Sequence, residues 1–402
     1  MSNVLNLLSE ETFAEKMDTQ NALLAIIAAG KEGGMEAASW KSIAQIVKMG
    51  LGEKAFPVGY EFTTEDADTG AVIVWAVRGH NHHKAANGNL KRTMTLEMKY
   101  VYGDSAGTYK GLQFDAPEAL YYAENELAAG TYNFTWNYAT GSMVSGTYQF
   151  TLTQPVPAGG QIVLGTNSSS RAITSCKVST YASVGATEAL ESGITVTEGS
   201  SGSSLGTMSA TASTEANLNC CQRVIWGSNN YAQSAAHQWL NGTKAAGSVW
   251  SPTNKFDRAP SWATTYNGFL HGLPSEFLGV VQPAVIPCRT NSVHEVNSLD
   301  DTEFATNQEY SLEDKFFLLS LPEIYGSWDN ANYKDGELLE YYNDFTNTER
   351  IKRDEGGSAH YAWLRSPNPG TANHVRYVGT SGTLGNNTAD IACAIAAACI
   401  IA

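Results

Sequence analysis

The strongest constraint on the fold of this chain is a glycine-led repeat in which aromatic and polar residues alternate. Residues 130–135 read Gly-Thr-Tyr-Asn-Phe-Thr, residues 146–151 read Gly-Thr-Tyr-Gln-Phe-Thr, and a looser copy begins at Gly107. A glycine turn followed by such alternation is typical of paired antiparallel strands. The repeat therefore predicts an all-β module, an immunoglobulin-like sandwich, over residues 106–205.

The aromatic residues of the repeat allow two interpretations. In the first, they form the core of the sandwich, whose strands point alternate side chains inward. In the second, Tyr132, Trp136 and Tyr148 are stacking platforms of a carbohydrate-binding module. The core interpretation is favoured, because large aromatic rings dominate the cores of such domains.

The remainder of the chain combines helices and strands, so the fold class is α+β. Apolar residues recur at helical spacing and predict an N-terminal helical segment over residues 1–54. The apolar face of residues 10–30 is either an oligomer seam or a surface that packs on its own domain. Residues 72–77 and 93–102 have the composition of strands.

Towards the C-terminus the sequence predicts short elements joined by irregular loops. Residues 231–240 fit one amphipathic helix, and residues 315–326 contain a buried strand. The apolar run at residues 389–402 is too short to cross a membrane and is predicted to be a buried final strand.

The charge of the chain excludes one class of partner. Its 402 residues include 25 Lys and Arg against 40 Asp and Glu, a formal net charge of −15. A protein that binds nucleic acid through phosphates needs a basic stripe, which this sequence lacks. The N-terminus has no basic signal region, so we expect assembly in a cytoplasm without membrane insertion.

No motif in the sequence indicates catalysis. The glycine-rich phosphate loops, the G-x-S-x-G elbow and the H-E-x-x-H zinc motif are all missing. The six cysteines include no C-x-x-C pair and are expected to be free thiols. The sequence therefore predicts a protein that is not an enzyme and has no cofactor.

Two polar clusters allow a metal-binding interpretation as well as a structural one. His80, His82 and His83 lie close enough in sequence to share a metal ion. A neighbouring Gly/Asn turn favours a solvated loop tip instead, so no metal site is expected. The acidic run at residues 65–70 lacks the full calcium-loop pattern and is predicted to be a turn.

Short motifs in the last third of the chain form a specific combination. Residues 229–241 carry N-x-Y-x-x-S followed by W-L-N, residues 363–367 read Trp-Leu-Arg-Ser-Pro, and residues 378–382 read Val-Gly-Thr-Ser-Gly. Together they resemble the signature of a widespread bacterial and phage domain of the DUF6273 type. That family has a C-type lectin-like fold, which it shares with formylglycine-generating enzymes. The resemblance implies one such domain formed by residues 55–105 and 206–402, with the β module inserted.

The composition of the C-terminus agrees with a further property of this family. Many members are variable proteins diversified by retroelements, in which adenines of a template repeat, mostly in the Asn codons AAC and AAT, are copied with errors. Codons made in this way end in a pyrimidine and cannot encode Lys, Glu, Gln, Met or Trp. Residues 356–402 contain none of these types except Trp363. The resemblance thus implies a variable region over residues 358–402, although a surface segment of small residues has the same composition.

The resemblance also divides this region into varied and fixed positions. The positions expected to vary and to bind ligand are His360, Tyr361, Asn368, Thr371, Asn373, His374, Tyr377, Gly379, Gly385, Asn386, Asn387, Thr388, Asp390, Ile391 and Cys393. The residues expected to fix the backbone are Arg365, Pro367, Ala372, Val378, Gly382, Leu384 and Ala389. Ala394 and Ala397 stand where the family has Gly and Pro, which leaves the geometry of the final strand open.

The function implied by the resemblance is hypervariable ligand binding. The expected protein is a phage tail receptor-binding protein that recognises a bacterial surface protein or glycan. The expected location is the virion, with the cell surface as the alternative. Many tail proteins are trimers, so residues 10–30 are a candidate homotrimer seam. Two alternatives stay open: a fixed-specificity carbohydrate-binding lectin or adhesin, and a formylglycine-generating type of enzyme that would use Cys393 and Cys399.

Overall fold

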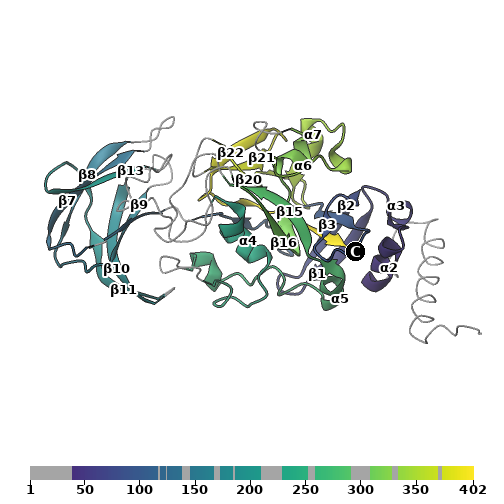
Figure 1. Cartoon of the computed structure of the whole chain (residues 1–402), viewed down its shortest axis with the longest axis horizontal. Coiled ribbons are helices and arrows are strands. Elements are labelled where there is room, and N and C mark those ends of the chain that lie inside the picture. Colours follow the sequence, from purple (N-terminus) through teal and green to yellow (C-terminus); the bar gives the residue numbers. More distant parts are fainter. Residues whose placement is uncertain are drawn as a thin grey trace, which may run out of the picture.

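The structure is a computed structural model of a mixed, mainly β protein (Figure 1). Its described residues form six sheets, one of them a half-barrel, and few helices. The residues that it describes are 39–115, 118–123, 125–137, 145–166, 173–183, 186–209, 229–251, 259–290, 308–327, 334–369 and 374–402. The predicted oligomer seam at residues 10–30 lies outside these ranges. The homotrimer, which was predicted from that seam, stays a prediction.

The largest sheet brings the last strand of the chain into its interior. Its order is β1-β2-β4-β24-β14, and a sixth strand, β17, also pairs with β24. The bounds are β1 (Glu61–Asp66), β2 (Ala71–His80), β4 (Met94–Met98), β24 (Ala397–Ile401), β14 (Val281–Gln282) and β17 (Phe316–Leu318). Every residue of β4 and β24 is buried, so the closing apolar strand predicted from the sequence is confirmed.

A second sheet, here named the C-terminal sheet, has the order β22-β21-β20-β23-β5. Its strands are β22 (Leu384–Thr388), β21 (His374–Val378), β20 (Ala362–Pro367), β23 (Cys393–Ala394) and β5 (Gly111–Leu112). Two small sheets lie beside it, formed by β16 (Glu309–Asp314), β15 (Ala284–Arg289) and β3 (Lys84–Ala85), and by β18 (Lys352–Arg353) and β19 (Ala359–His360).

The helices are short and cover the sheets. They are α2 (Trp40–Lys48), α3 (Gly52–Ala55), η2 (Tyr231–Gln233), α4 (Ala235–Leu240), η3 (Ser261–Thr264), α5 (Ser275–Val280), α6 (Leu321–Tyr325), η4 (Glu340–Tyr342) and α7 (Asn347–Arg350). The single helix predicted over residues 231–240 is divided, because the Ser234 hydroxyl accepts the backbone N–H of His237 and starts α4.

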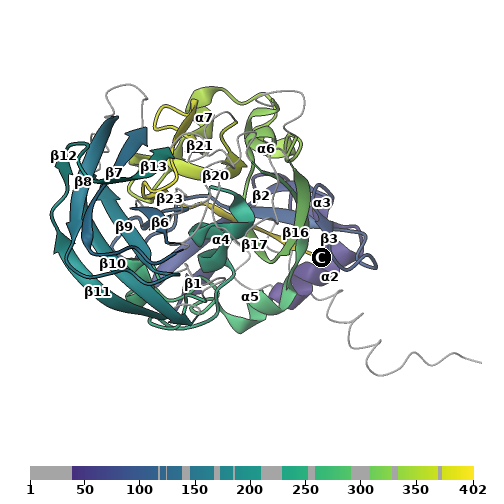
Figure 2. The same cartoon turned by 60° about the vertical axis from the view of Figure 1, so that its left-hand side comes forward.

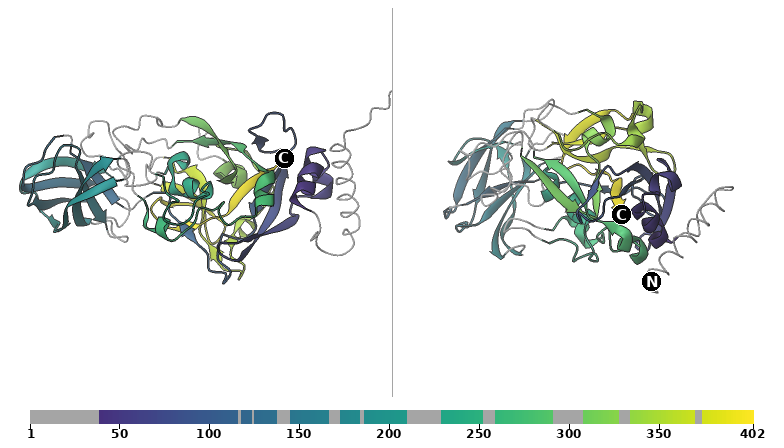
Figure 3. Two further views of the ribbon diagram at one scale, coloured as in Figure 1. Left: turned by 90° about the horizontal axis from the view of Figure 1, so that it is seen from below. Right: turned by 45° about the vertical axis from the view of Figure 1, so that its right-hand side comes forward.

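The glycine-led repeat forms a β-hairpin inside a separate two-sheet module. The sheets have the orders β11-β10-β9-β6 and β12-β8-β7-β13 and share one core (Figure 2). Their strands are β6 (Glu118–Tyr122), β9 (Gln161–Thr166), β10 (Ile173–Ser183), β11 (Ala186–Ile194), β7 (Gly130–Asn137), β8 (Gly146–Leu152), β12 (Thr197–Glu198) and β13 (Ser203–Ser209). Figure 3 shows this module at the opposite end of the molecule from α2 and α3.

The aromatic residues of the repeat belong to the core of the module. Tyr132, Trp136 and Tyr148 are 9%, 3% and 3% exposed, and Phe134 faces Tyr148 across the hairpin. A ring buried to this extent has no free face for a sugar. The stacking-platform alternative is therefore wrong for these three residues, and the core interpretation holds.

The looser copy of the repeat lies outside the module. Tyr109 forms a bridge with Gly103, β5 pairs with β23 of the C-terminal sheet, and Phe114 is buried in the main core. The module in the structure thus begins at β6 and ends at β13, later than the predicted residues 106–205. A period-two pattern does not specify the partner of a strand, and this copy pairs elsewhere.

The remaining predictions from the sequence have mixed outcomes. The strand at residues 72–77 is confirmed as part of β2, and residues 93–102 contain the shorter strand β4. Of residues 65–70, predicted to be a turn, the first two end strand β1 and residues 67–70 form the turn to β2. Residues 315–326 contain the buried strand β17 and also helix α6. The four described cysteines, Cys176, Cys288, Cys393 and Cys399, are buried free thiols, as predicted. Within the described ranges, no helix has the length and apolar character needed to span a membrane.

A buried ionic cluster joins β2, β4, η4 and β18. The Glu97 carboxylate accepts Arg78 Nε at 2.7 Å, Lys352 Nζ at 2.5 Å and the Tyr342 hydroxyl at 2.5 Å. Burial lowers the pKa of Lys352, although Glu97 opposes that change. Because a buried charge without its partner is costly, each member depends on the others.

Lys352→Met is predicted to lower the free energy of unfolding by about 3 kcal/mol, because it leaves the buried Glu97 charge partly uncompensated. Lys99→Met is the control, since Lys99 and Glu61 form an exposed pair 2.8 Å apart, and its effect should be under about 1 kcal/mol. Urea denaturation of both variants measures the difference. Equal losses would contradict the role given to the buried cluster.

Candidate functional site

Strands β21, β22 and β23 of the C-terminal sheet carry seven of the fifteen predicted ligand-binding positions. Strands β21 and β22 pair in continuous register from His374 opposite Thr388 to Val378 opposite Leu384. Side chains alternate along a strand, so His374 and Tyr377 lie on opposite faces of β21. The predicted positions on these strands are therefore divided between the two faces of one sheet.

One face presents a pair of tyrosines. Tyr361 is 49% exposed, and its ring meets that of the half-buried Tyr377 edge to face, with centroids 5.0 Å apart. Tyr377 in turn contacts Trp363, which is buried beneath it. On β22, Gly385 lies opposite Tyr377, and a side chain there would overlap the ring. This pair, here named the tyrosine pair, thus combines an exposed ring with a rigid support.

A second aromatic contact adjoins the tyrosine pair along the chain. The His360 ring lies 4.1 Å from that of Tyr109, which is 39% exposed, and His360 Nε2 is 2.8 Å from Asp354 Oδ2. This hydrogen bond lowers the pKa of Asp354. Tyr109 is not among the predicted site residues, because its glycine-led sequence predicts a place in the β module. Nothing in its local pattern indicates a partner so far away in the chain.

The other face near the sheet edge is polar. His374 Nδ1 is hydrogen-bonded to Asn386 Oδ1 at 2.7 Å, and Asn386 is exposed. Imidazole and amide groups at an accessible edge strand supply directional hydrogen bonds to a ligand.

Several predicted binding residues do not reach the surface. The buried ones are Asn368, Gly379, Thr388 and Cys393, so none of the four can contact an external ligand in this conformation. The accessible or half-buried ones are His360, Tyr361, His374, Tyr377, Gly385, Asn386, Asn387, Asp390 and Ile391, here named the C-terminal surface. Thr371 and Asn373 lie outside the described residues.

The positions expected to fix the backbone are mostly buried. Those buried are Arg365, Pro367, Val378, Gly382 and Ala389, while Leu384 is half-buried and Ala372 lies outside the described residues. Gly382 has a φ of +76°, and a Cβ there would overlap the backbone oxygen of Asn347. Only glycine therefore fits this turn between β21 and β22.

A buried ion pair anchors β20 beneath the C-terminal surface. Arg365 Nη1 and Nη2 donate to the two carboxylate oxygens of Glu323 at 2.7 and 2.6 Å. Burial alone would raise the pKa of Glu323, but Arg365 and His83 outweigh it and hold the pKa far below its usual range. The Ser320 backbone N–H also donates to Glu323, which completes a capping box at the start of α6.

A second buried carboxyl group, that of Asp335, belongs to a residue whose backbone carbonyl accepts a hydrogen bond from Arg365. Asp335 is buried, its Oδ2 accepts the Ser366 hydroxyl, and its Oδ1 has no hydrogen-bond partner among the described residues. Burial raises the pKa of Asp335 from its ordinary 3.8 to about 6, against the opposing charge of Arg365. The neutral form is thus favoured in the folded protein at mildly acidic pH.

The cysteines of the final strands lack the environment of reactive thiols. Burial raises the pKa of Cys393 to about 12 and that of Cys399 well above its ordinary value. A reactive cysteine needs an accessible thiolate, which burial opposes in both cases. These two residues therefore give no support to formylglycine-generating chemistry.

The histidine cluster differs from the predicted solvated loop tip. His83 is 3% exposed, with Nδ1 3.0 Å from Thr95 Oγ1 and Nε2 3.0 Å from Glu323 Oε1. His82 is half-buried beside it, and burial followed by the His83 charge lowers the pKa of His82. The loop-tip interpretation is wrong because Glu323, which is distant in sequence, closes over this turn.

One family matches this chain. Residues 214–402 match a family described as a domain of unknown function, DUF6273. The chain carries a DUF6273 domain. No curated protein and no solved structure matches the chain. The DUF6273 domain does not contain its whole folding unit, because β24 pairs with β4, which precedes the matched residues.

Gly382→Ala is predicted to lower the free energy of unfolding by about 3 kcal/mol, because the new Cβ meets the Asn347 backbone in addition to the strained φ. Gly357→Ala is the matched control: its φ is +88°, but no atom lies within 4 Å of the added Cβ. Its cost should be about 1 kcal/mol. Denaturant unfolding separates the two, and similar losses would contradict the close packing under Gly382.

Asp335→Asn is predicted to reduce the loss of stability between pH 4 and pH 7. An acid whose pKa is higher in the folded than in the unfolded protein stabilises the fold fully at pH values below its unfolded-state pKa. This stabilisation is lost as the pH rises through its folded-state pKa. For Asp335 the window runs from about pH 4 to about pH 6, and the loss is on the order of 2 kcal/mol. Urea denaturation of both proteins at each pH measures it. Identical pH dependence in the two proteins would contradict the shift.

Proposed function

We propose that this chain is a ligand-binding protein whose C-terminal surface varies between sibling copies. The observation that carries the proposal is the division of residues 358–402 into two sets. Positions such as Tyr361 and Asn386 are exposed, whereas Arg365, Val378 and Gly382, between them in sequence, are buried. A site can change its side chains at little cost when other contacts hold its backbone.

The chemistry of the C-terminal surface suits recognition more than catalysis. The tyrosine pair offers contact area with few rotatable bonds, and Tyr361 already rests against Tyr377 before any ligand binds. His374 and Asn386 add donors and acceptors at the sheet edge. A tyrosine that packs on other rings is typical of a binding hot spot, and His374 and Asn386 would add polar contacts on the other face of the sheet.

We further propose that the DUF6273 domain and β1 to β4 together have a C-type lectin-like fold. Two features support this assignment. The chain returns to place its closing strand β24 beside β4, and residues 61–98 and 231–402 contribute to one core. The module from β6 to β13 is then an insertion between the two parts, with a core of its own.

The proposed setting is a phage tail, where the protein binds a bacterial surface protein or glycan. The support is the family resemblance together with the lack of Lys, Glu, Gln and Met in residues 356–402, which agrees with pyrimidine-ending codons. A homotrimer would present several copies of the C-terminal surface, and avidity would strengthen weak single contacts.

Tyr361→Ala is predicted to weaken binding to host cells about 30-fold, the effect of losing about 2 kcal/mol at an aromatic hot spot. Labelled protein is first tested on a panel of bacterial strains, and the affinity for a bound strain is then measured by flow cytometry. Val72→Ala is the control, since Val72 is 52% exposed on β2, outside the C-terminal surface. Equal binding by the Tyr361 variant and the unchanged protein would contradict the proposed site.

A further inference from the structure

A cavity of about 690 Å³ lies beneath the turn that follows β2. Its wall includes His82, His83 and Lys84 from that turn, and Glu323, Glu337 and Glu340 from the segment that begins with α6. The two parts are far apart in sequence and meet only in the folded chain. The cavity is separate from the C-terminal surface.

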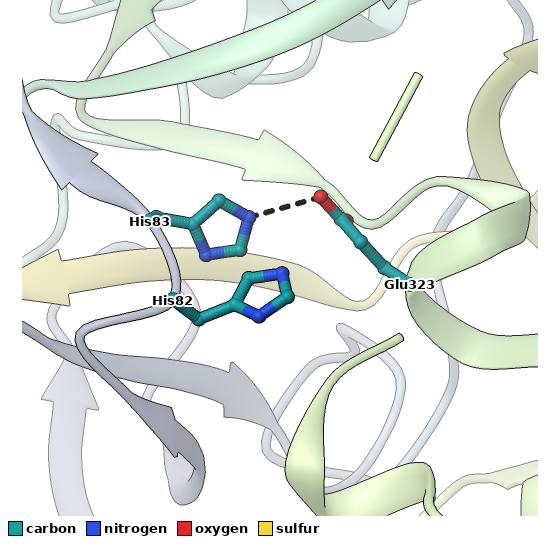
Figure 4. Close-up of side chains that lie close together, drawn as sticks. All are labelled: His82, His83 and Glu323. Carbon is teal, nitrogen blue, oxygen red and sulfur yellow. Dashed lines mark hydrogen bonds and ion pairs between the residues drawn. The ribbon is translucent and has the colours of Figure 1, made fainter. Parts of the chain in front are cut away.

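Three side chains in this wall converge on one point. Figure 4 shows both imidazole rings directed toward the carboxylate of Glu323. The candidate ligand atoms of His82, His83 and Glu323 all lie within 4.8 Å of one another. Ligand atoms around a tetrahedral ion with bonds of about 2.1 Å are roughly 3.4 Å apart, so small side-chain rotations bring these three to bonding distance.

We propose that His82, His83 and Glu323 form a binding site for a divalent transition-metal ion of the zinc type. Two imidazole nitrogens and one carboxylate oxygen are a ligand set that such ions prefer. Three protein ligands leave at least one coordination position free. Because all three residues line the cavity, that position is accessible to water or to a small anionic molecule inside it.

The surroundings of the ligands are those of an oriented metal site. His83 Nδ1 is held by Thr95 Oγ1 at 3.0 Å, and the His83 carbonyl accepts the Thr93 hydroxyl at 2.7 Å. These bonds fix the ring with Nε2 toward Glu323. Partners of this kind on the far side of a ligating histidine set its orientation and strengthen the metal bond.

His82 supplies the independent observation. Within the described residues its ring makes no hydrogen bond, although it lies edge to face against His83 with centroids 4.8 Å apart. A half-buried imidazole directed at a carboxylate–imidazole pair has an unused nitrogen. A metal ion accounts for that nitrogen, whereas a purely structural turn does not require a second histidine.

The positive charge of Arg365 repels a cation at this site, and the negative charges of nearby carboxylates offset that repulsion. Both of its Nη atoms are bound to Glu323, and Nη2 also donates to the Asp335 carbonyl. Glu337 and Glu340 line the same cavity. Arg365 thus orients the Glu323 carboxylate from the side away from the histidines. The side of the carboxylate that faces His82 and His83 is then available to the ion. The inference stands whether or not the C-terminal surface binds a receptor.

Zinc titration of the metal-free full chain, prepared without a histidine tag, tests the site by isothermal calorimetry. The unchanged protein should bind one Zn²⁺ ion, and His82→Ala should bind it at least tenfold more weakly. His80→Ala is the matched control, because His80 lines the same cavity outside the cluster, and its affinity should stay within about twofold. His82→Gln keeps the side-chain volume and should show the same loss if the alanine variant fails to fold.

Cobalt substitution identifies the ligand atoms independently. Co²⁺ bound by two nitrogens and an oxygen gives visible bands without the near-ultraviolet charge-transfer band of a thiolate ligand. The expected spectrum has these visible bands, which His82→Ala abolishes. The proposal is overturned if the unchanged protein shows no saturable zinc binding, if the His82 variants bind as tightly as it does, or if a thiolate band shows that cysteines hold the ion.

Discussion

The buried ion pair between Arg365 and Glu323 joins strand β20 to helix α6, and the C-terminal surface is built on that strand. Both side chains are excluded from water, and Arg365 also donates to the backbone oxygens of Leu318 and Pro287. A buried charge pair is stable only if every polar atom finds a partner. One guanidinium thus fixes β20 relative to α6, β15 and β17, and this leaves the side chains at the sheet edge free to differ.

The same pair connects the two proposed sites of the molecule. Glu323 accepts hydrogen bonds from Arg365 on one side and lies beside His83 on the other. The C-terminal surface and the cavity therefore share one carboxylate as a structural element, but no accessible residue. Variation at Tyr361 or Asn386 changes the first without reaching the second. A protein with a diversified surface needs such separation if the rest of its fold is to stay constant.

Local patterns in the sequence predicted those elements whose own residues alternate in polarity or form an apolar run. The alternation in β7 and β8 and the apolar closing strand belong to this class. The exposed Tyr361 was instead predicted from the family resemblance. Contacts between distant segments were missed. His83 and Glu323 are 240 residues apart in sequence. Tyr109, which belongs to the looser copy of the glycine-led repeat, contacts the distant His360. The family resemblance also placed Thr388 and Cys393 among the ligand-binding positions, but both are buried in the structure.

Sequencing sibling copies of this gene, with any linked template repeat from the same source, tests the diversified C-terminal surface most directly. We expect adenine-specific differences within residues 358–402, concentrated at exposed or half-buried positions such as Tyr361, His374, Tyr377 and Asn386. Arg365, Val378 and Gly382 should be the same in every copy. Differences spread evenly over buried and exposed positions, or a region identical in all siblings, would contradict a diversified binding surface.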